Sequence, residues 1–555
     1  MRKISALTLS PEHPLQALLL GALTAAALLT LSACGESKEA ASSAHSAAAA
    51  KTSTAAAPAP AERPLIYAGE GLTAINPLLN AHDELPNLIF SGLMKYDAAG
   101  RPVPDLCTKM KASPDGLAYT FTLRDNLKWQ DGSALTAADV VFTYNLIRSP
   151  EAALSAIQSN YLDIKSVEAL DARTVKFELV KPNAAMPGYF TLGLVPEHLV
   201  KGRDIFTMPF NQAPVGSGRY MLESWDRQGG RIILKANPYY YGKKPEIETI
   251  VYCTIADESA KSTMLSSGEA DLAWLNANYA QSFRGREGWQ NIDFKSADLR
   301  AISFDFHTDF VKENADSLML LNYALDKNAL VQGVLQGHGF PAYGLLQLNA
   351  LGQNKEADLY PYNLELFAKM MREAGWEQGA DGIYVRDGQR FSFSVQVREY
   401  EEERVDLANI CSAMLKQAGV EMQVVPVTHF DFKAGYNAYL YGNAAQFDPD
   451  AWYSVLHTGG SDNNMSYANA EVDKLLDAGR YTLNENERRA IYQRFELEYA
   501  KQPGMVPLVY LEGNYAARAE LQGLDTRRLL GHHAAGVFWN VEDWHFASPE
   551  TRQGE

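Results

Sequence analysis

From residue 64 onward, hydrophobic and polar residues follow two periodicities. Residues 119–123 are Tyr-Thr-Phe-Thr-Leu, the alternation of a half-buried strand. Thr136 precedes an apolar segment, with Asp139 three residues later, and this pair predicts a capped helix N-terminus. Strands are also predicted at 65–68, 174–180 and 231–236, and helices at 80–96 (after an initial loop), 317–335, 363–374, 404–418, 470–478 and 485–499. Because strands and helices interleave throughout, an α/β fold is predicted.

The N-terminus has the pattern of an export signal. Arg2 and Lys3 precede an almost wholly apolar stretch at 17–31, as in a secretory signal peptide. The stretch ends in Leu-Ser-Ala-Cys and resembles the lipobox of bacterial lipoproteins, in which a peptidase cuts before the cysteine and the sulfur carries diacylglycerol. We predict a signal peptide over 1–33 and lipidation of Cys34. The alternative is an ordinary small-residue cleavage site with a chance cysteine.

Residues 34–63 have a different composition from the rest of the chain. They are mostly Ala, Ser, Pro and Thr, with almost no large apolar side chain. Such a segment cannot bury enough surface to fold, so it is predicted to be a flexible tether. The globular body is therefore expected in the periplasm or at the outer face of the cell membrane, held there by the lipid.

Composition excludes several classes of protein. The chain has 555 residues, 46% of them hydrophobic, which suits a globular protein of two or three lobes. Its formal net charge of −17 argues against nucleic acid as a partner, because phosphate binding needs a basic face. After the N-terminus no apolar run reaches about 18 residues, so the body is not expected to span a membrane. The chain has four cysteines and no CxxC spacing, so Cys107, Cys253 and Cys411 are predicted to be buried free thiols rather than parts of a disulfide framework.

Several motifs together resemble one protein family. They are PDL at 104–106, SPDGLAYTFTLRDNLKWQDG at 113–132, LTAADVVF at 135–142, PVGSGRY at 214–220, NPYYYGKKP at 237–245, SGEAD at 267–271, LNYALDK at 321–327, AGW at 374–376 and YANAEVD at 467–473. In this order they closely resemble the signature of the family 5 extracellular solute-binding proteins. Those proteins are the peptide-, nickel- and opine-binding components of ABC importers.

The resemblance implies a two-lobed periplasmic-binding-protein-like fold of type II. Two segments would cross between the lobes at a hinge that encloses the ligand. The first lobe would comprise 64–302 and 512–555, with an extra subdomain at about 106–213, and the second lobe 303–511. Most motif residues, including Phe121 and Trp129, are expected to belong to the scaffold.

The resemblance also points to the loop around 437–467 as a source of ligand contacts. Peptide-binding members carry an aspartate three residues before an acidic-Pro pair, and it holds the peptide's α-ammonium group. Here that pair is Asp448-Pro449 and the equivalent residue is Ala445, so standard recognition of the amine is in doubt. The tryptophan that precedes the aspartate looks replaced by Gly442, which is expected to leave room for a bulkier or non-peptide ligand.

Nine residues are the candidate ligand contacts. Asp448 and Glu84 are considered as substitutes for the missing carboxylate. The competing interpretation is lobe packing for Trp452 and Tyr467, and capping of a helix begun by Pro449 for Asp448. The full set is His82, Glu84, Tyr441, Asn443, Gln446, Asp448, Trp452, Asn464 and Tyr467.

The predicted function is capture of a small solute, with a peptide favoured, by lobe closure and its delivery to ABC permease subunits. The alternative ligand is a nickel chelate (a metallophore), to which His82, His457 or a neighbouring histidine would add one protein ligand. A ligand-sensing receptor is a further alternative. No nucleophile, base and oxyanion set is recognisable, so no enzymatic activity, resident metal or cofactor is expected. The adjacent His532 and His533 are expected to point to opposite faces of a strand. A monomer is expected.

Overall fold

The computed structural model describes residues 63–547, except for 73, 80–83, 350, 355 and 357–359. The predicted signal peptide, the lipidation site Cys34, nearly all of the tether and the candidate contact His82 lie outside the described residues. In the part of the chain that is described, no helix is long and apolar enough to cross a membrane. Cys107, Cys253 and Cys411 are free; Cys107 and Cys411 are buried, as expected, whereas Cys253 is only partly buried.

A mixed sheet of eleven strands forms the centre of the body. β17 pairs in parallel with β18 and β19, β1 pairs in parallel with β10 and β11, and the remaining pairs are antiparallel. The order is β18 (Glu421–Val427), β17 (Ser392–Arg398), β19 (Ala438–Ala444), β12 (Trp289–Phe304), β20 (Met505–Arg518), β11 (Leu272–Trp274), β1 (Leu65–Gly69), β10 (Thr249–Thr254), β9 (Arg231–Ala236) and β8 (Tyr220–Asp226), with β13 (Gly339–Pro341) also on β20.

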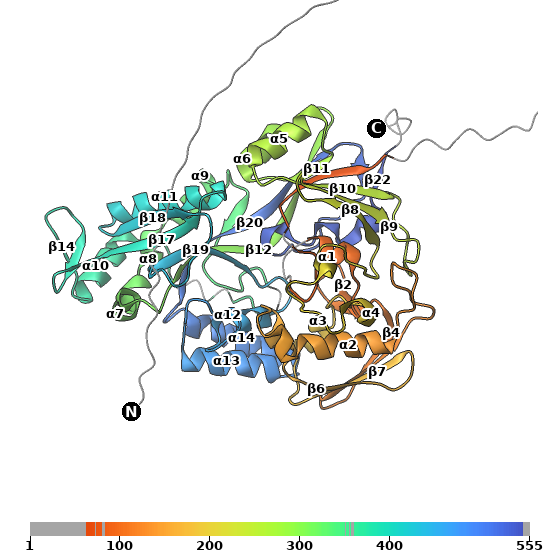
Figure 1. Ribbon diagram of the computed structural model, residues 1–555. Coiled ribbons are helices and arrows are strands. Elements are labelled where there is room, and N and C mark those ends of the chain that lie inside the picture. Colours follow the sequence, from red (N-terminus) through yellow and green to blue (C-terminus); the bar gives the residue numbers. More distant parts are fainter. Residues whose placement is uncertain are drawn as a thin grey trace, which may run out of the picture. The chain divides into compact units, whose positions relative to one another are not determined.

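The long strands β12 and β20 join the two halves of this sheet. They pair from Trp289 with Arg518 to Ser303 with Met505, with register irregularities between Lys295 and Leu299 and between Arg300 and Ala301. Beyond β12 lie only strands from residues 392–444, and beyond β20 strands from the N-terminal half of the chain. We call the half that contains β1 the first lobe and the half that contains β19 the second lobe (Figure 1). The expected two-lobed α/β fold with two crossing segments is confirmed.

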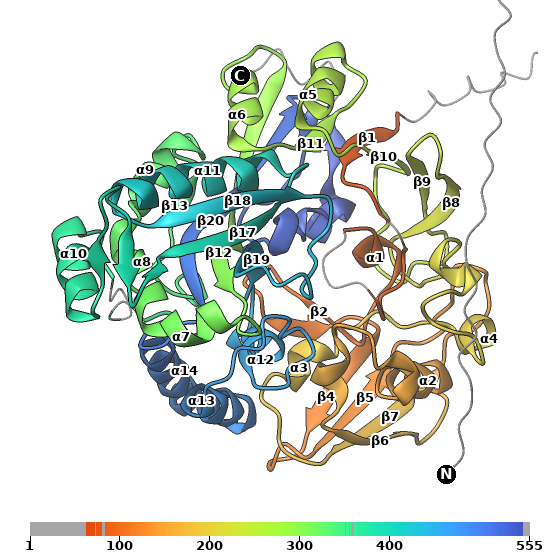
Figure 2. The same ribbon diagram turned by 60° about the vertical axis from the view of Figure 1, so that its left-hand side comes forward.

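A four-stranded antiparallel sheet forms a subdomain of the first lobe (Figure 2). Its order is β4 (Cys107–Ala112), β5 (Ala118–Leu123), β7 (Thr174–Leu179) and β6 (Ile164–Ala169). Helix α2 (Ala137–Ile147) packs on β6 and β7 and has the predicted capping box: the Thr136 hydroxyl accepts from the backbone, and Asp139 accepts from the Thr136 N–H at 2.9 Å. Phe121 on β5 and Phe177 on β7 pack edge to face in the core of the subdomain, as the alternation of half-buried strands predicts.

The other strands and helices are shorter or peripheral. The strands are β2 (Met94–Tyr96), β3 (Pro102–Pro104), β14 (Glu377–Gln378), β15 (Tyr384–Arg386), β16 (Gln389–Arg390), β21 (Leu521–Gln522) and β22 (His545–Phe546). The helices are α1 (Glu84–Ile89), α3 (Met186–Tyr189), α4 (Glu197–Val200), α5 (Glu258–Ser267), α6 (Ala277–Ala280), α7 (Asp309–Leu318), α8 (Leu321–Ala324), α9 (Lys327–Gly333), α10 (Leu364–Glu373), α11 (Glu402–Gln417), α12 (Tyr453–Leu456), α13 (Ala470–Tyr481) and α14 (Glu485–Tyr499).

Two predicted helices are wrong in extent. The helix expected over 317–335 is divided into α7, α8 and α9, because Leu325 is extended and the Asp326 carboxylate caps a new helix by accepting from Ala329 N–H. The helix expected within 80–96 ends at Ile89, whose carbonyl accepts from Gly218 N–H at 2.8 Å and from Gln130 Nε2 at 3.0 Å. Periodicity alone cannot detect either stop.

The contact between α13 and α14 in the second lobe depends on a glycine. A Cβ atom added at Gly479 would lie 2.6 Å from the buried Tyr492 ring. We predict that Gly479→Ala lowers the unfolding free energy by about 1–3 kcal/mol, because overpacking forces the two helices apart. Differential scanning calorimetry measures this loss.

Gly333 provides the matched control. It is exposed at the end of α9, and an added Cβ would meet no atom within 4 Å. We expect Gly333→Ala to leave the melting temperature unchanged or slightly raised, since alanine favours helix. Equal melting temperatures for the two variants would contradict the close α13–α14 contact.

Candidate ligand-binding cleft

Two adjoining cavities, of about 430 and 500 Å³, lie between the lobes. The smaller, which we call the lower cavity, is lined by Tyr96, Gln446 and Asp448 among others. The larger, the upper cavity, is lined by Trp274, Tyr441 and Arg404 among others. Four residues line both cavities and mark their junction: Glu84 and His532 from the first lobe, and Asn443 and Asp462 from the second.

Strand β19 brings the second lobe's side chains to the junction. Tyr441 lines the upper cavity. The ring centroids of Phe430 and Phe432 lie 5.9 and 6.4 Å from that of Tyr441, so the three rings pack together. Two residues further, Asn443 points to the same face, as strand periodicity requires. Its Nδ2 is buried and has no hydrogen-bond partner among the described residues. A buried donor without a partner is costly, so Asn443 offers a hydrogen bond to a ligand.

Glu84 stands at the start of α1 and is 9% exposed. Its Oε1 accepts backbone hydrogen bonds from Gly536 at 2.7 Å and Val537 at 3.2 Å. This carboxylate therefore fixes the C-terminal segment of the first lobe against α1, at the edge of the junction.

Beside the junction the hinge strand β12 carries a buried ion pair. Asp298 contacts the Arg300 guanidinium and lies 2.7 Å from His532 Nδ1. Burial would raise the pKa of Asp298, but Arg300 and His532 hold it well below its usual value. Burial lowers the pKa of His532 well below its usual value, so a neutral imidazole donates to Asp298. The Asp298 carboxylate thereby links the hinge to the first lobe.

Arg404, at the start of α11, lies next to Arg300. It is 2% exposed, its Nη1 donates to the Leu440 carbonyl at 3.2 Å, and its Nε contacts Glu401. Its Nη2 has no hydrogen-bond partner among the described residues. Burial and the charge of Arg300 lower the pKa of Arg404 to about 10. The two guanidiniums thus lie close together in the cavity wall, Arg300 against Asp298 and Glu403 and Arg404 against Glu401.

Gly442 permits this arrangement. A Cβ atom there would lie 2.5 Å from His532 Cε1, 2.6 Å from Arg300 Nη1 and 3.1 Å from Arg404 Nη2. The expectation that Gly442 leaves room for a bulkier ligand is therefore wrong: the space is filled by the side chains of the protein itself.

Asp462 is the second carboxylate at the junction of the two cavities. It lies in the loop after α12, where its N–H donates to Ser454 and its Oδ1 accepts from Asn464 Nδ2 at 2.9 Å. No basic side chain contacts it among the described residues. Burial raises its pKa to about 6. Asp462 lies within the predicted 437–467 region, but it was not among the candidate contacts.

Of the predicted contacts, Gln446 and Asp448 line the lower cavity but are held by the scaffold. Gln446 Nε2 donates to the Leu529 carbonyl at 2.5 Å. Asp448 makes a two-pronged ion pair with Arg488, at 2.8 and 2.6 Å, and accepts from Asp450 N–H at 2.9 Å as the cap of a short 3₁₀ helix. Asp448 therefore caps the short helix that Pro449 begins, as the competing interpretation expected.

Three other candidates belong to the packing of the second lobe. Trp452 is 1% exposed and lines neither cavity, and its Nε1 donates to the Leu345 carbonyl at 3.3 Å. Tyr467 is buried with its hydroxyl on the Gln502 carbonyl, and Asn464 supports Asp462 from behind. Tyr467 and Asn464 border only a small void of about 20 Å³. Ala445 packs in the same core, so the position expected to hold an aspartate faces away from the cavities.

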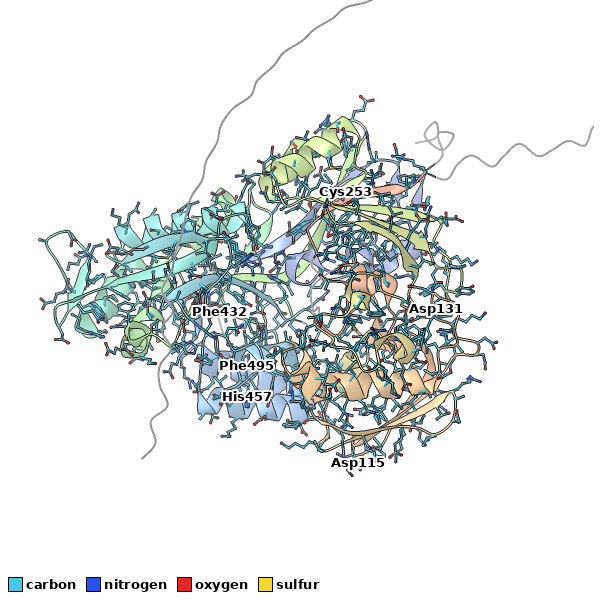
Figure 3. All side chains as sticks on the ribbon, in the orientation of Figure 1. Asp115, Asp131, Cys253, Phe432, His457 and Phe495 are labelled. Atoms are coloured by element: carbon cyan, nitrogen blue, oxygen red, sulfur yellow. The ribbon has the colours of Figure 1, made fainter. Side chains whose placement is uncertain are left out.

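The histidines also differ from expectation. His457 lies beside the helices of the second lobe (Figure 3), stacked on Tyr453 and bordering neither cavity, so it is removed as a nickel ligand. His532 and His533 lie in a 3₁₀ turn, His532–Ala534, rather than a strand, and both line the upper cavity. Within the described residues no group of three or more His, Cys, Asp or Glu side chains is placed to hold a metal ion.

The signal for the missed residues was present in the sequence of β12. Asp298 and Arg300 are two residues apart, on one face of the strand, and mostly apolar residues follow them to Phe304. Buried charges at this spacing indicate a partnered site. Asp462 and Arg404 carry no comparable local signal.

Comparison with known proteins identifies the family. The model of bacterial extracellular solute-binding proteins, family 5 Middle, matches residues 101–466. Protein XP55 of Streptomyces lividans is 32% identical, covering 84% of this chain and 87% of its own length. The oligopeptide-binding protein AppA of Bacillus subtilis is 27% identical, covering 86% and 90%.

Solved structures of similar proteins support the same family. NikZ from Campylobacter jejuni, in complex with Ni(L-His), has a TM-score of 0.82 at 32% identity, covering 87% of this chain and 99% of NikZ. AppA from Bacillus subtilis, in complex with a nonapeptide, has a TM-score of 0.77 at 25% identity, covering 88% and 99%. The expected type II periplasmic-binding-protein-like fold is thereby confirmed. The chain belongs to the bacterial extracellular solute-binding proteins of family 5.

Proposed function

We propose that this protein captures short peptides in the cleft between its lobes and delivers them to the permease of an ABC importer. Membership of the family supports capture of a solute outside the cytoplasm. The oligopeptide-binding AppA and the dipeptide-binding protein of Escherichia coli, 24% identical, support a peptide as the ligand. Binding and release require no covalent step.

The observation that carries the proposal is the pair of guanidiniums at Gly442. Arg300 and Arg404 are each 2% exposed, yet both line the upper cavity. Burial lowers the pKa of Arg404, and repulsion by the charge of Arg300 lowers it further. A ligand carboxylate placed against the Arg404 Nη2 edge would relieve that repulsion and make charge-assisted hydrogen bonds. A peptide supplies such a carboxylate at its C-terminus.

Contacts on both sides of the cleft explain how binding would close the lobes. The ligand would meet Trp274 and Glu84 from the first lobe and Asn443 and Arg404 from the second. Only a ligand that contacts both lobes binds the closed state better than the open one, and only that difference shifts the equilibrium.

A nickel complex of an amino acid is the second candidate. Its support is the similarity to NikZ, whose structure holds Ni(L-His). Because the described residues provide no metal cluster, nickel would arrive already chelated. The chelator's carboxylate would use the same guanidiniums.

The proposal includes a lipid anchor on Cys34, a tether over 34–63 and a monomeric body with lobes 64–302 plus 512–555 and 303–511. The Leu-Ser-Ala-Cys sequence at 31–34 supports the anchor. Two acyl chains hold a protein stably on a membrane without a spanning helix.

We predict that Cys34→Ser moves the protein from the membrane fraction to the soluble fraction of its host. Mass spectrometry of the N-terminal peptide of the natural chain should show a diacylglycerol thioether. An unmodified cysteine there would contradict the anchor.

The ligand is tested by native mass spectrometry of the protein purified without denaturation from its host. We expect a ladder of added masses that fragment as short peptides. One added mass with the nickel isotope pattern, lost on chelation, would replace the peptide by the second candidate. A protein that carries no solute and binds neither free tripeptides nor Ni(II)–L-histidine would overturn the proposed function.

The guanidinium site is tested at Gly442. We predict that Gly442→Ala weakens binding of a tripeptide by about tenfold or more, since overpacking by one methyl group costs about 1–3 kcal/mol. Gly71→Ala adds the same methyl group at the rim of the upper cavity, where a Cβ meets no atom within 4 Å. Isothermal titration calorimetry should show unchanged affinity for Gly71→Ala, and equal losses in both variants would contradict the assignment.

A further inference from the structure

We infer that Asp462 selects ligands that present a cationic group at the junction of the two cavities, and so favours free amines over metal chelates. The inference rests on the proposed function and assigns the residue that determines its ligand class. It starts from the position of Asp462, which borders the lower cavity, the upper cavity and the small void behind them.

The environment of Asp462 differs from that of three other carboxylates around the cleft. Glu258 contacts Lys261 at 2.8 Å, Glu403 lies 3.3 Å from Arg300, and Asp448 is paired with Arg488. Asp462 accepts only from the neutral Asn464 amide among the described residues. A mostly buried carboxylate without a cation is unfavourable, and a ligand cation would remove this cost.

The loop holds this carboxylate in a fixed place. Asp462 N–H donates to the Ser454 carbonyl at 3.0 Å. The next residue, Asn463, donates from Nδ2 to the carbonyls of His457 and Tyr467 and accepts from Tyr467 N–H. A group positioned before the ligand arrives loses little conformational entropy on binding.

The wall around Asp462 suits a cation. The Tyr441 ring lies in the same wall, and its pKa is raised to about 12 by burial and by the charge of Asp462, which places the two groups close together. Trp274 also lines the upper cavity, with the Lys261 ammonium group 5.4 Å from its ring centroid. Aromatic faces attract ammonium groups.

This arrangement distinguishes the two ligand candidates. A peptide carries a free ammonium group at neutral pH, so it can neutralise Asp462 while its carboxylate meets Arg404. In a nickel–amino-acid chelate the amine is bound to the metal and carries no ammonium charge. The positive charge of a 1:1 chelate lies on the metal, so the chelate gives Asp462 no ammonium group to accept hydrogen bonds from.

The test compares two matched ligand sets: a tripeptide mixture with free amines and the same mixture N-acetylated, with Ni(II)–L-histidine as a third ligand. The full chain in mild detergent is titrated at pH 7.5 by calorimetry. We expect Asp462→Asn to weaken free-amine binding about 30-fold or more, as for one partner of a buried charge pair, and to leave acetylated ligands unaffected. Asp316→Asn removes one exposed carboxylate on α7 and should change neither.

A pH series gives a readout that a merely structural role would not produce. Because the pKa of Asp462 is about 6, the natural protein should lose its preference for free amines as the pH falls from 7.5 to 5. Asn464 contacts Asp462, Tyr441 lies close to it, and the other titratable groups that line both cavities with it are Glu84 and His532. Tyr441 and His532 stay neutral in this range, and a preference that persists in Asp462→Asn would belong to Glu84.

The outcomes separate the inference from the proposed function. Tripeptide binding by the natural protein with no discrimination against acetylation, or with discrimination unchanged in Asp462→Asn, overturns the inference alone. Binding of Ni(II)–L-histidine in preference to tripeptides also overturns it. Binding of no ligand at all overturns the proposed function, and the inference with it.

Discussion

The buried contact between Asp298 and Arg300 on β12 is the interaction on which the cleft depends. A charge pair that is 1–2% exposed is stable only with further partners, and here these come from both sides of the hinge. His532 contacts Asp298 from the first lobe, while Glu403 approaches Arg300 from the second. One carboxylate on a crossing strand thus positions the guanidinium wall and the histidine turn together.

The remaining charges around the cleft divide into those that stabilise the scaffold and those that face the cavity. Asp448 and Arg488, and likewise Asp450 and Arg480, form two-pronged pairs that fix the second lobe's loop on its helices. The Arg404 edge and Asp462 lack such completion among the described residues. A charged ligand can bind where charges in a cavity wall are incompletely paired. Because Arg404 is positive and Asp462 is negative, this wall suits a zwitterion.

Much of the fold could be predicted from the sequence. Alternation identified β5 and β7, and the Thr136–Asp139 spacing identified the start of α2, because these signals act over a few residues. The site was predicted less well. Glu84, Tyr441 and Asn443 do reach the cleft, but Trp452 and Tyr467 pack in a core, since an aromatic side chain in a loop has the same local pattern in either place.

By itself the sequence determined the interleaved α/β lobes, the family and the loop that follows β19, all of which follow from local periodicity and ordered motifs. Tertiary structure alone decided which charges face the ligand. Arg300, Arg404 and His532 meet at Gly442 although they lie on three distant segments, and only their packing shows that no side chain fits between them. The same holds for Asp462: that it has no basic neighbour among the described residues can be seen only in the tertiary structure, because segments distant in sequence line the cavities with it.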